Sequence, residues 1–121
     1  MRIGIIGAGN IGDTLGKAWS DRGHEVVFGV RDPHSPKTQK ALNETGGQVQ
    51  AVRFEDAAAF GEVLVLAVPW AAVRETVAAL GNVQGKIIID ATNRLTQTAE
   101  DAPSAAEDVQ KLAVGAKVVK A

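Results

Sequence analysis

Short runs of apolar residues alternate along the chain with longer stretches in which apolar residues recur every three or four positions. The short runs predict strands at 3–6, 25–30, 48–52, 63–68, 86–90 and 117–120. The longer stretches predict helices at 11–22, 36–45, 71–80 and 104–113, with a short turn at 56–60. The run 63–68 is apolar at every position, which is typical of a parallel strand covered on both faces. The pattern therefore predicts an α/β fold: a Rossmann-type, doubly wound parallel sheet of about six strands with helices on both faces.

The turn between the first strand and the first helix follows the pattern G-x-G-x-x-G, in residues Gly7, Ala8, Gly9, Asn10, Ile11 and Gly12. With 13 glycines in the chain, the pattern alone is weak, but a strand before it and a helix and second strand after it are the context of a dinucleotide-binding turn. Gly7 permits the tight turn, Gly9 lets a pyrophosphate approach the backbone, and Gly12 lets the helix pack closely. N–H groups near Asn10 and Ile11 would bind the diphosphate. A glycine turn that binds nothing is the alternative.

The residues after the second strand bear on the choice of dinucleotide. An acidic residue at the end of this strand is typical of NAD sites, whereas Val30 stands here and Arg31 follows. A guanidinium binds a 2′-phosphate through two hydrogen bonds and stacks on adenine, and Ser35 and Lys37 lie in the same loop. We therefore predict NADP(H). Two alternatives stay open: a register shift of two would place Asp32 at the ribose, and an Arg31–Asp32 surface pair would leave the arginine without a binding role.

Three segments, 1–32, 63–70 and 88–95, resemble the N-terminal domain of NADPH-dependent deazaflavin-coenzyme reductases and, more distantly, pyrroline-5-carboxylate reductases. The resemblance implies that the cofactor contacts the ends of the first, second, fourth and fifth strands. Besides the glycine turn and Arg31, it implies contacts at Ala67, Val68, Pro69, Thr92 and Asn93.

The chain departs from the pattern of that family in three places. Val30 replaces a residue that often carries a hydroxyl, and Arg94 stands where a proline is expected. The third departure is that the chain ends at Ala121, just after the expected sixth strand, where relatives continue into a segment that completes the substrate pocket. The chain is either a complete short protein or part of a longer one.

No residue is predicted to be catalytic, because hydride transfer depends on the apposition of two rings more than on acid or base groups. The chain has no Tyr for a Tyr/Lys proton relay, and with no Cys and only two His residues a metal site is not expected. Asp90 ends a strand and is interpreted as structural, with general acid as the alternative. Trp70 either walls the nicotinamide pocket or is a core aromatic, and Trp19 is predicted to be core.

The 13 basic and 14 acidic residues leave a net charge of −1, which argues against a nucleic-acid partner. The apolar runs fall well short of the ~20 residues of a membrane span, so we expect no membrane association and a cytoplasmic location. We expect one domain, 1–121, and a homodimer would cover its apolar last strand.

These features predict an NADP(H)-binding oxidoreductase domain that transfers hydride between NADPH and a small-molecule acceptor: a deazaflavin, a flavin-like compound or an imine. The alternative is a non-catalytic NADP-binding module, such as a sensor or regulatory subunit. The loops at 67–70 and 90–93 favour the oxidoreductase, whereas the early end of the chain favours the module. Whether the chain is an enzyme stays open.

Overall fold

The structure is a computed structural model that describes residues 1–7, 10–46, 49–91, 110 and 112–120, with the backbone alone for 10–13 and 120. The strands are β1 Arg2–Ile6, β2 Glu25–Val30, β3 Gln50–Arg53, β4 Val63–Leu66, β5 Ile87–Asp90 and β6 Lys117–Lys120. The helices are α1 Asn10–Asp21, α2 Pro36–Glu44, α3 Phe54–Phe60 and α4 Val73–Leu80, with a 3-10 turn, η1, at Trp70–Ala72.

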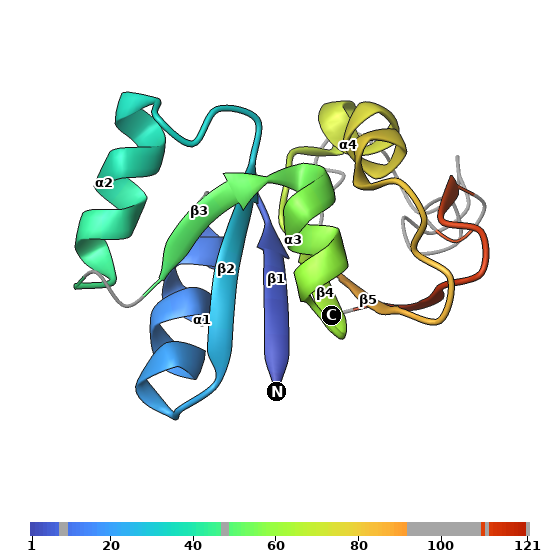
Figure 1. Ribbon diagram of the computed structural model, residues 1–121. Coiled ribbons are helices and arrows are strands. Elements are labelled where there is room, and N and C mark those ends of the chain that lie inside the picture. The colour runs from blue at the N-terminus through green and yellow to red at the C-terminus, as the bar shows by residue number, and fades with distance from the viewer. Residues whose placement is uncertain (8–9, 47–48, 92–109, 111, 121) are drawn as a thin grey trace.

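The six strands form one sheet in the order β3-β2-β1-β4-β5-β6, and every neighbouring pair is parallel. This confirms the predicted doubly wound α/β fold. All strands therefore point their carboxyl ends toward one edge of the sheet, and for β1 and β2 this edge is at the top in Figure 1. The chain moves outward from β1 to β2 and β3, then crosses back to β4, so the direction of winding reverses between β1 and β4.

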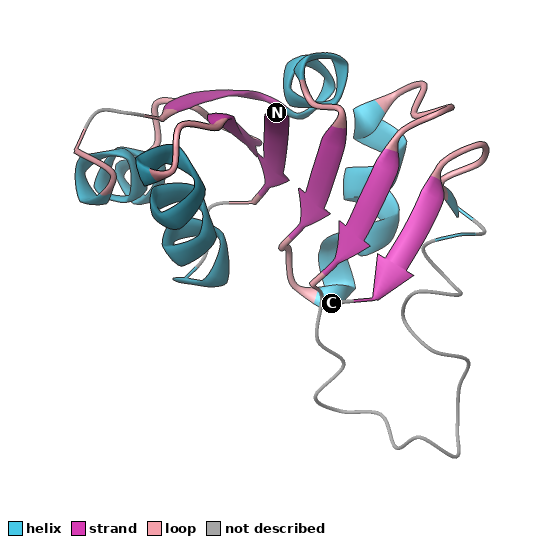
Figure 2. Ribbon diagram, turned by 90° about the horizontal axis from the view of Figure 1, so that it is seen from below, coloured by secondary structure: helices cyan, strands magenta, loops and turns pink. Residues whose placement is uncertain are grey.

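Alternate residues of each strand face opposite layers of helices. One layer holds Ile5, Phe28 and Val65 against α1 and α2, and the other holds Ile6 and Leu64 against α3 and α4. Figure 2 shows helices on the two sides of the sheet. Each of these side chains is almost fully buried, which stabilises the fold by about 1.5–3 kcal/mol apiece. Trp19 packs in the first layer, as predicted.

The stretch predicted as a short turn at 56–60 is instead a two-turn helix, α3, which starts at Phe54 directly after β3. This helix lies very close to β1 and β2 because small residues face it. A Cβ on Gly4 would lie 2.8 Å from the Ala57 carbonyl oxygen, and one on Gly29 would lie 2.8 Å from the Ala57 Cβ. Packing against these glycines stabilises a helix too short to be stable by itself.

Other predicted boundaries differ from those of the structure by one or two residues. The fourth predicted strand, 63–68, ends at Leu66. The hydrogen bonds from this segment to β1 end with Ala67, whose N–H donates to the Ile6 carbonyl at 2.8 Å. They do not continue, because Pro69 has no N–H to donate. The predicted helix 104–113 falls largely outside the described residues.

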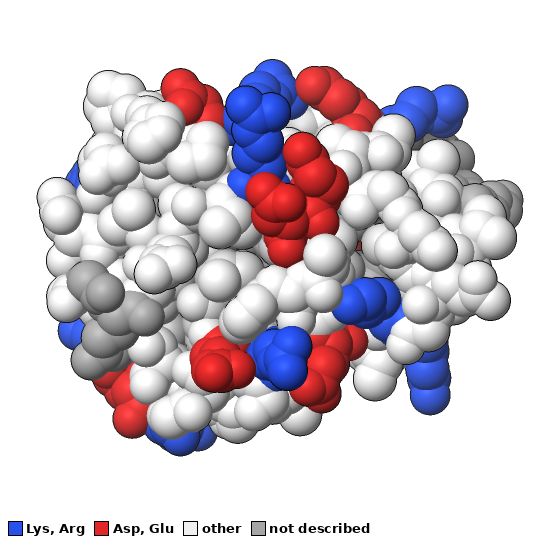
Figure 3. All heavy atoms as spheres, in the orientation of Figure 1, with Lys and Arg blue, Asp and Glu red and all other residues white. Residues whose placement is uncertain are grey.

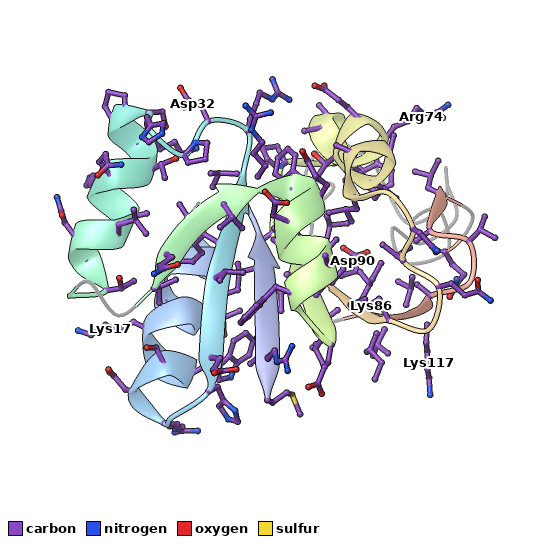
Figure 4. All side chains as sticks on the ribbon, in the orientation of Figure 1. Lys17, Asp32, Arg74, Lys86, Asp90 and Lys117 are labelled. Atoms are coloured by element: carbon purple, nitrogen blue, oxygen red, sulfur yellow. The ribbon has the colours of Figure 1, made fainter. Side chains whose placement is uncertain are left out.

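Two side chains tie the ends of elements together. Lys86 Nζ donates to the Gly61 carbonyl at 2.6 Å, which places a cation at the carboxyl end of α3 (Figure 4). The side-chain amide of Gln110 makes two hydrogen bonds to backbone groups, as a neighbouring strand would. Nε2 donates to the Ala116 carbonyl at 2.7 Å, and Oε1 accepts from Val118 N–H at 3.1 Å. Gln110 thereby satisfies polar backbone groups on the outer edge of β6.

Candidate functional site

Gly7 makes a tight turn directly after β1, at the point where the winding of the sheet reverses. Its φ is +107°, in the region that favours glycine, and its N–H donates to the Gly29 carbonyl at 2.8 Å. A Cβ here would lie 2.6 Å from the Ala67 carbonyl oxygen and 3.0 Å from Val68 Cγ1. Both the backbone conformation and the close approach of the β4 end therefore require glycine at this position, as the sequence predicted.

Helix α1 begins at Asn10, three residues after Gly7, and its amino end lies at the carboxyl edge of the sheet. The first N–H groups of a helix have no partner within the helix, and the helix dipole adds positive potential there. The predicted contacts Asn10, Ile11 and Gly12 lie in this first turn, where the structure describes the backbone alone. Ala8 and Gly9 lie outside the described residues.

Arg31 is the first residue after β2, as predicted, and Val30, which ends the strand, is buried. The alternative of a surface pair between Arg31 and Asp32 is not what the structure shows. Arg31 Nη2 lies 2.8 Å from Glu75 Oε1, on the first turn of α4. Asp32 Oδ1 instead accepts the backbone N–H of His34 at 2.9 Å, so this carboxylate shapes its own loop.

The other two predicted contacts in this loop differ in what they do. Ser35 is the N-cap of α2: its Oγ accepts Thr38 N–H at 3.2 Å and donates to Thr38 Oγ1 at 2.9 Å. Its hydroxyl therefore has a structural role. Lys37 is exposed on the first turn of α2, where its ammonium is accessible to solvent.

The segment after β4 passes directly beside the glycine turn. Ala67 is half-buried, Val68 is buried, and Pro69 is exposed at the start of η1. The chain just after β5 lies beside the end of β4, because Ala91 N–H donates to the Leu66 carbonyl at 3.0 Å. The structure thus brings Ala67 and Val68 to Gly7, whereas the predicted contacts Thr92 and Asn93 lie outside the described residues.

A hollow of about 250 Å³ opens beside Arg31, between the ends of β2 and β3 and helix α4. It is lined by Val30, Arg31, Arg53, Phe54, Glu55, Glu75 and Ala79. Two of these residues are basic and two are acidic, and Figure 3 shows basic and acidic side chains side by side above the sheet. The sequence analysis missed Glu75 because nothing local links it to Arg31; only the fold brings α4 to the end of β2.

Comparison with known proteins identifies the family. Residues 2–94 match the family model described as NADP oxidoreductase, coenzyme F420-dependent. The chain belongs to this family of NAD(P)-dependent oxidoreductases. The resemblance stated from the sequence is thereby confirmed.

Two curated relatives and one solved structure illustrate this F420-dependent NADP oxidoreductase family and its neighbours. The F420-dependent NADP reductase of Methanothermobacter thermautotrophicus is 36% identical over 99 residues, covering 76% of this chain and 43% of the relative. A glycerol-3-phosphate dehydrogenase [NAD(P)+] of Chlorobium phaeobacteroides is 33% identical over 102 residues, covering 74% of this chain and 31% of the relative. A crystal structure from Arthrobacter sp. FB24, assigned provisionally as an F420-dependent NADP reductase, has a TM-score of 0.85 at 31% identity and covers 99% of this chain and 61% of that one.

The chain thus spans less than half the length of these curated relatives. Within the described ranges, no helix combines the length and apolar character needed to cross a bilayer. The described residues also contain no cluster of three or more His, Cys, Asp or Glu side chains that would hold a metal ion.

Asp90 and Trp70 also had two interpretations each from the sequence. Asp90 ends β5 with no exposed surface, under the helices in Figure 4, which favours the structural role. Trp70 is half-buried and packs against the core cluster beneath α3 and α4, which favours the core role over a pocket wall.

Proposed function

We propose that residues 1–121 form the NADP(H)-binding domain of an oxidoreductase that transfers hydride between NADPH and a deazaflavin acceptor. The observation that carries this proposal is the left-handed turn at Gly7, at the reversal point of a sheet ordered β3-β2-β1-β4-β5-β6. In sheets of this order, dinucleotides bind at the carboxyl edge across the reversal point. The exposed guanidinium of Arg31 lies on the neighbouring strand end.

The diphosphate would be held by backbone rather than by side chains. Gly7 turns the chain just before α1, which begins at Asn10, and at the start of this helix unpaired N–H groups and the helix dipole favour an anion. Gly7 must lack a side chain for this turn to form, because the end of β4 already occupies the space that a Cβ would need. Ala8, Gly9, Asn10 and Ile11 would complete the cradle.

The adenosine end would be recognised by charge. A guanidinium pairs with a phosphate through two parallel hydrogen bonds, so Arg31 would hold the 2′-phosphate, and the exposed ammonium of Lys37 would add a second cation. Val30 presents no carboxylate to ribose hydroxyls, which removes the usual basis for NAD preference. Ser35 would contribute through the loop geometry that its cap of α2 maintains.

The nicotinamide end would lie along Ala67, Val68 and Pro69, with Thr92 and Asn93 as polar contacts. When bound, NADPH supplies a hydride at this end. The chain would bind and orient the two reactants and exclude water, which does not require an acid or base of its own. Coenzyme F420, a deazaflavin, is the acceptor favoured by the family; flavin-like compounds and imines are the other classes.

A non-catalytic NADP-binding module is the second candidate. The observation in its favour is that the features argued above, the Gly7 turn and the exposed Arg31, would bind a dinucleotide and need no acceptor. Such a module would bind NADPH without oxidising it in the presence of any acceptor. A homodimer and a cytoplasmic location stay predictions in both proposals.

The first experiment is a titration of the folded chain with NADPH and with NADH. We expect tighter binding of NADPH, and Arg31→Ala should weaken NADPH binding by about 10- to 100-fold while changing NADH binding little. Oxidation of NADPH on addition of a deazaflavin would support the oxidoreductase, whereas binding without turnover would support the module. If the folded chain binds neither dinucleotide, the proposed function is wrong.

A further inference from the structure

The guanidinium that would recognise the 2′-phosphate already has an anionic partner. Arg31 Nη2 and Glu75 Oε1 lie 2.8 Å apart, and each side chain is 68% exposed. The pair joins the end of β2 to the first turn of α4 across the rim of the 250 Å³ hollow. Both residues line this hollow, so an anion that binds Arg31 there lies close to the carboxylate.

The net charge of the residues that line the hollow depends on Glu75, the partner of Arg31. Arg31 and Arg53 are brought together because β3 pairs with β2 at Val30 and Arg53, and Glu55 and Glu75 offset them. With Glu75 present, the lining carries two cations and two anions. Without its charge, the lining would carry one net positive charge beside the phosphate site.

A carboxylate and a phosphate compete for one guanidinium because both use the same two N–H directions. An exposed ion pair is weak, so a phosphate is able to displace Glu75. The displaced carboxylate then remains within a few ångström of a group that carries nearly two negative charges, which opposes binding. NADH has no such phosphate and would not be opposed in this way.

We propose that Glu75 sets the preference between NADPH and NADH by competing with the 2′-phosphate for Arg31. This inference rests on the proposed function, because it assumes that the chain binds NADPH at this edge. Glu75 acts as a specificity-determining residue: its carboxylate weakens NADPH binding and leaves NADH binding nearly unchanged. The chain therefore discriminates between the two dinucleotides less than Arg31 alone would allow.

The test compares Glu75→Gln with the wild-type chain in titrations with NADPH and NADH. Glu75→Gln should tighten NADPH binding by about five- to tenfold, with less than a twofold change for NADH. Glu55→Gln is the matched control, because it removes the same charge from the same hollow at a residue for which no ion pair with Arg31 is seen. This control should change the ratio of the two Kd values by less than twofold.

A double-mutant cycle assigns the effect to Arg31. In an Arg31→Gln background, Glu75→Gln should tighten NADPH binding clearly less than in the wild-type chain, because the competition for Arg31 no longer exists and only the repulsion between carboxylate and phosphate is removed. Equal tightening of NADPH and NADH, weaker NADPH binding in Glu75→Gln, or an equal effect of Glu55→Gln would each overturn the inference. Failure of the proposed function is distinguishable, since the wild-type chain would then bind neither dinucleotide.

Discussion

Replacing Gly7 with alanine would impose two separate costs on the fold, and two other glycines allow each cost to be measured alone. The first cost is conformational, because Gly7 has a φ of +107°. The second is steric, because the new Cβ would lie 2.6 Å from the Ala67 carbonyl oxygen. Gly23→Ala carries only the first, since its φ is +87° and nothing lies within 4 Å of an added Cβ. Gly4→Ala carries only the second, through the Ala57 carbonyl oxygen at 2.8 Å.

The magnitudes follow from these geometries. An alanine in the left-handed region costs about 1–2 kcal/mol, which is the loss of unfolding free energy expected for Gly23→Ala. Inserting a methyl group against packed atoms costs about 1–3 kcal/mol, which is the loss expected for Gly4→Ala. Gly7→Ala should lower the unfolding free energy by roughly the sum of the two costs, about 2–5 kcal/mol. Its steric cost should be near the upper end of the range, because the contact at Gly7 is shorter than the contact at Gly4. A domain of this size has a stability of roughly 6–18 kcal/mol, so the variants should remain largely folded in water.

Urea unfolding followed by tryptophan fluorescence measures all three variants, because Trp19 and Trp70 are partly buried and will change environment on unfolding. The slope of unfolding free energy against urea should stay constant, so that shifts in midpoint report stability alone. If Gly7→Ala loses no more stability than Gly23→Ala, the close approach of the β4 end to the glycine turn does not exist in solution. If Gly4→Ala is neutral, the tight packing of α3 on β1 is wrong.

Three further substitutions test side-chain contacts that stabilise the fold. Lys86→Met should lower the unfolding free energy by about 1–3 kcal/mol through loss of the hydrogen bond to the Gly61 carbonyl, and Lys86→Arg, which keeps the charge, should lose less in the same urea experiment. Ser35→Ala should cost about 1 kcal/mol by removing the cap of α2, whereas Ser35→Gly should cost a few tenths, and equal losses would contradict the cap. Gln110→Ala should speed hydrogen exchange at the Val118 amide, which would otherwise stay protected; an unchanged rate would show that the amide clamp on β6 is not formed.

The sequence predicted β1, β2, β4 and β5 well because each contains a run of apolar residues, and in β4 every position is apolar. It failed at α3, where Phe54–Phe60 is too short to show a helical period and follows β3 without a turn residue. That helix forms because Gly4 and Gly29 leave room for it on the sheet. The information that decides α3 is therefore located on β1 and β2, far from the helix in the sequence.

The candidate site likewise has local features that the sequence predicts and a contact between elements that it does not. The role of Gly7 was predictable, because a turn between a strand and a helix is a local feature. The position of Arg31 was also predictable, since it depends only on where β2 ends. Its partner was not: the expected neighbour Asp32 bonds to its own loop, and Glu75 reaches Arg31 only because α4 packs beside the end of β2. Local chemistry is readable from sequence, whereas pairs between elements require the fold.

Gly7 and the pair of Arg31 and Glu75 differ in how much the fold depends on them, and this difference affects how easily cofactor preference changes. The fold itself requires glycine at Gly7, so a substitution there costs stability whatever the ligand. Arg31 and Glu75 are each 68% exposed and belong to a weak surface pair, so replacing either should cost the fold little. If the chain binds a dinucleotide as proposed, its preference between NADPH and NADH is then free to vary while the Gly7 turn stays constant.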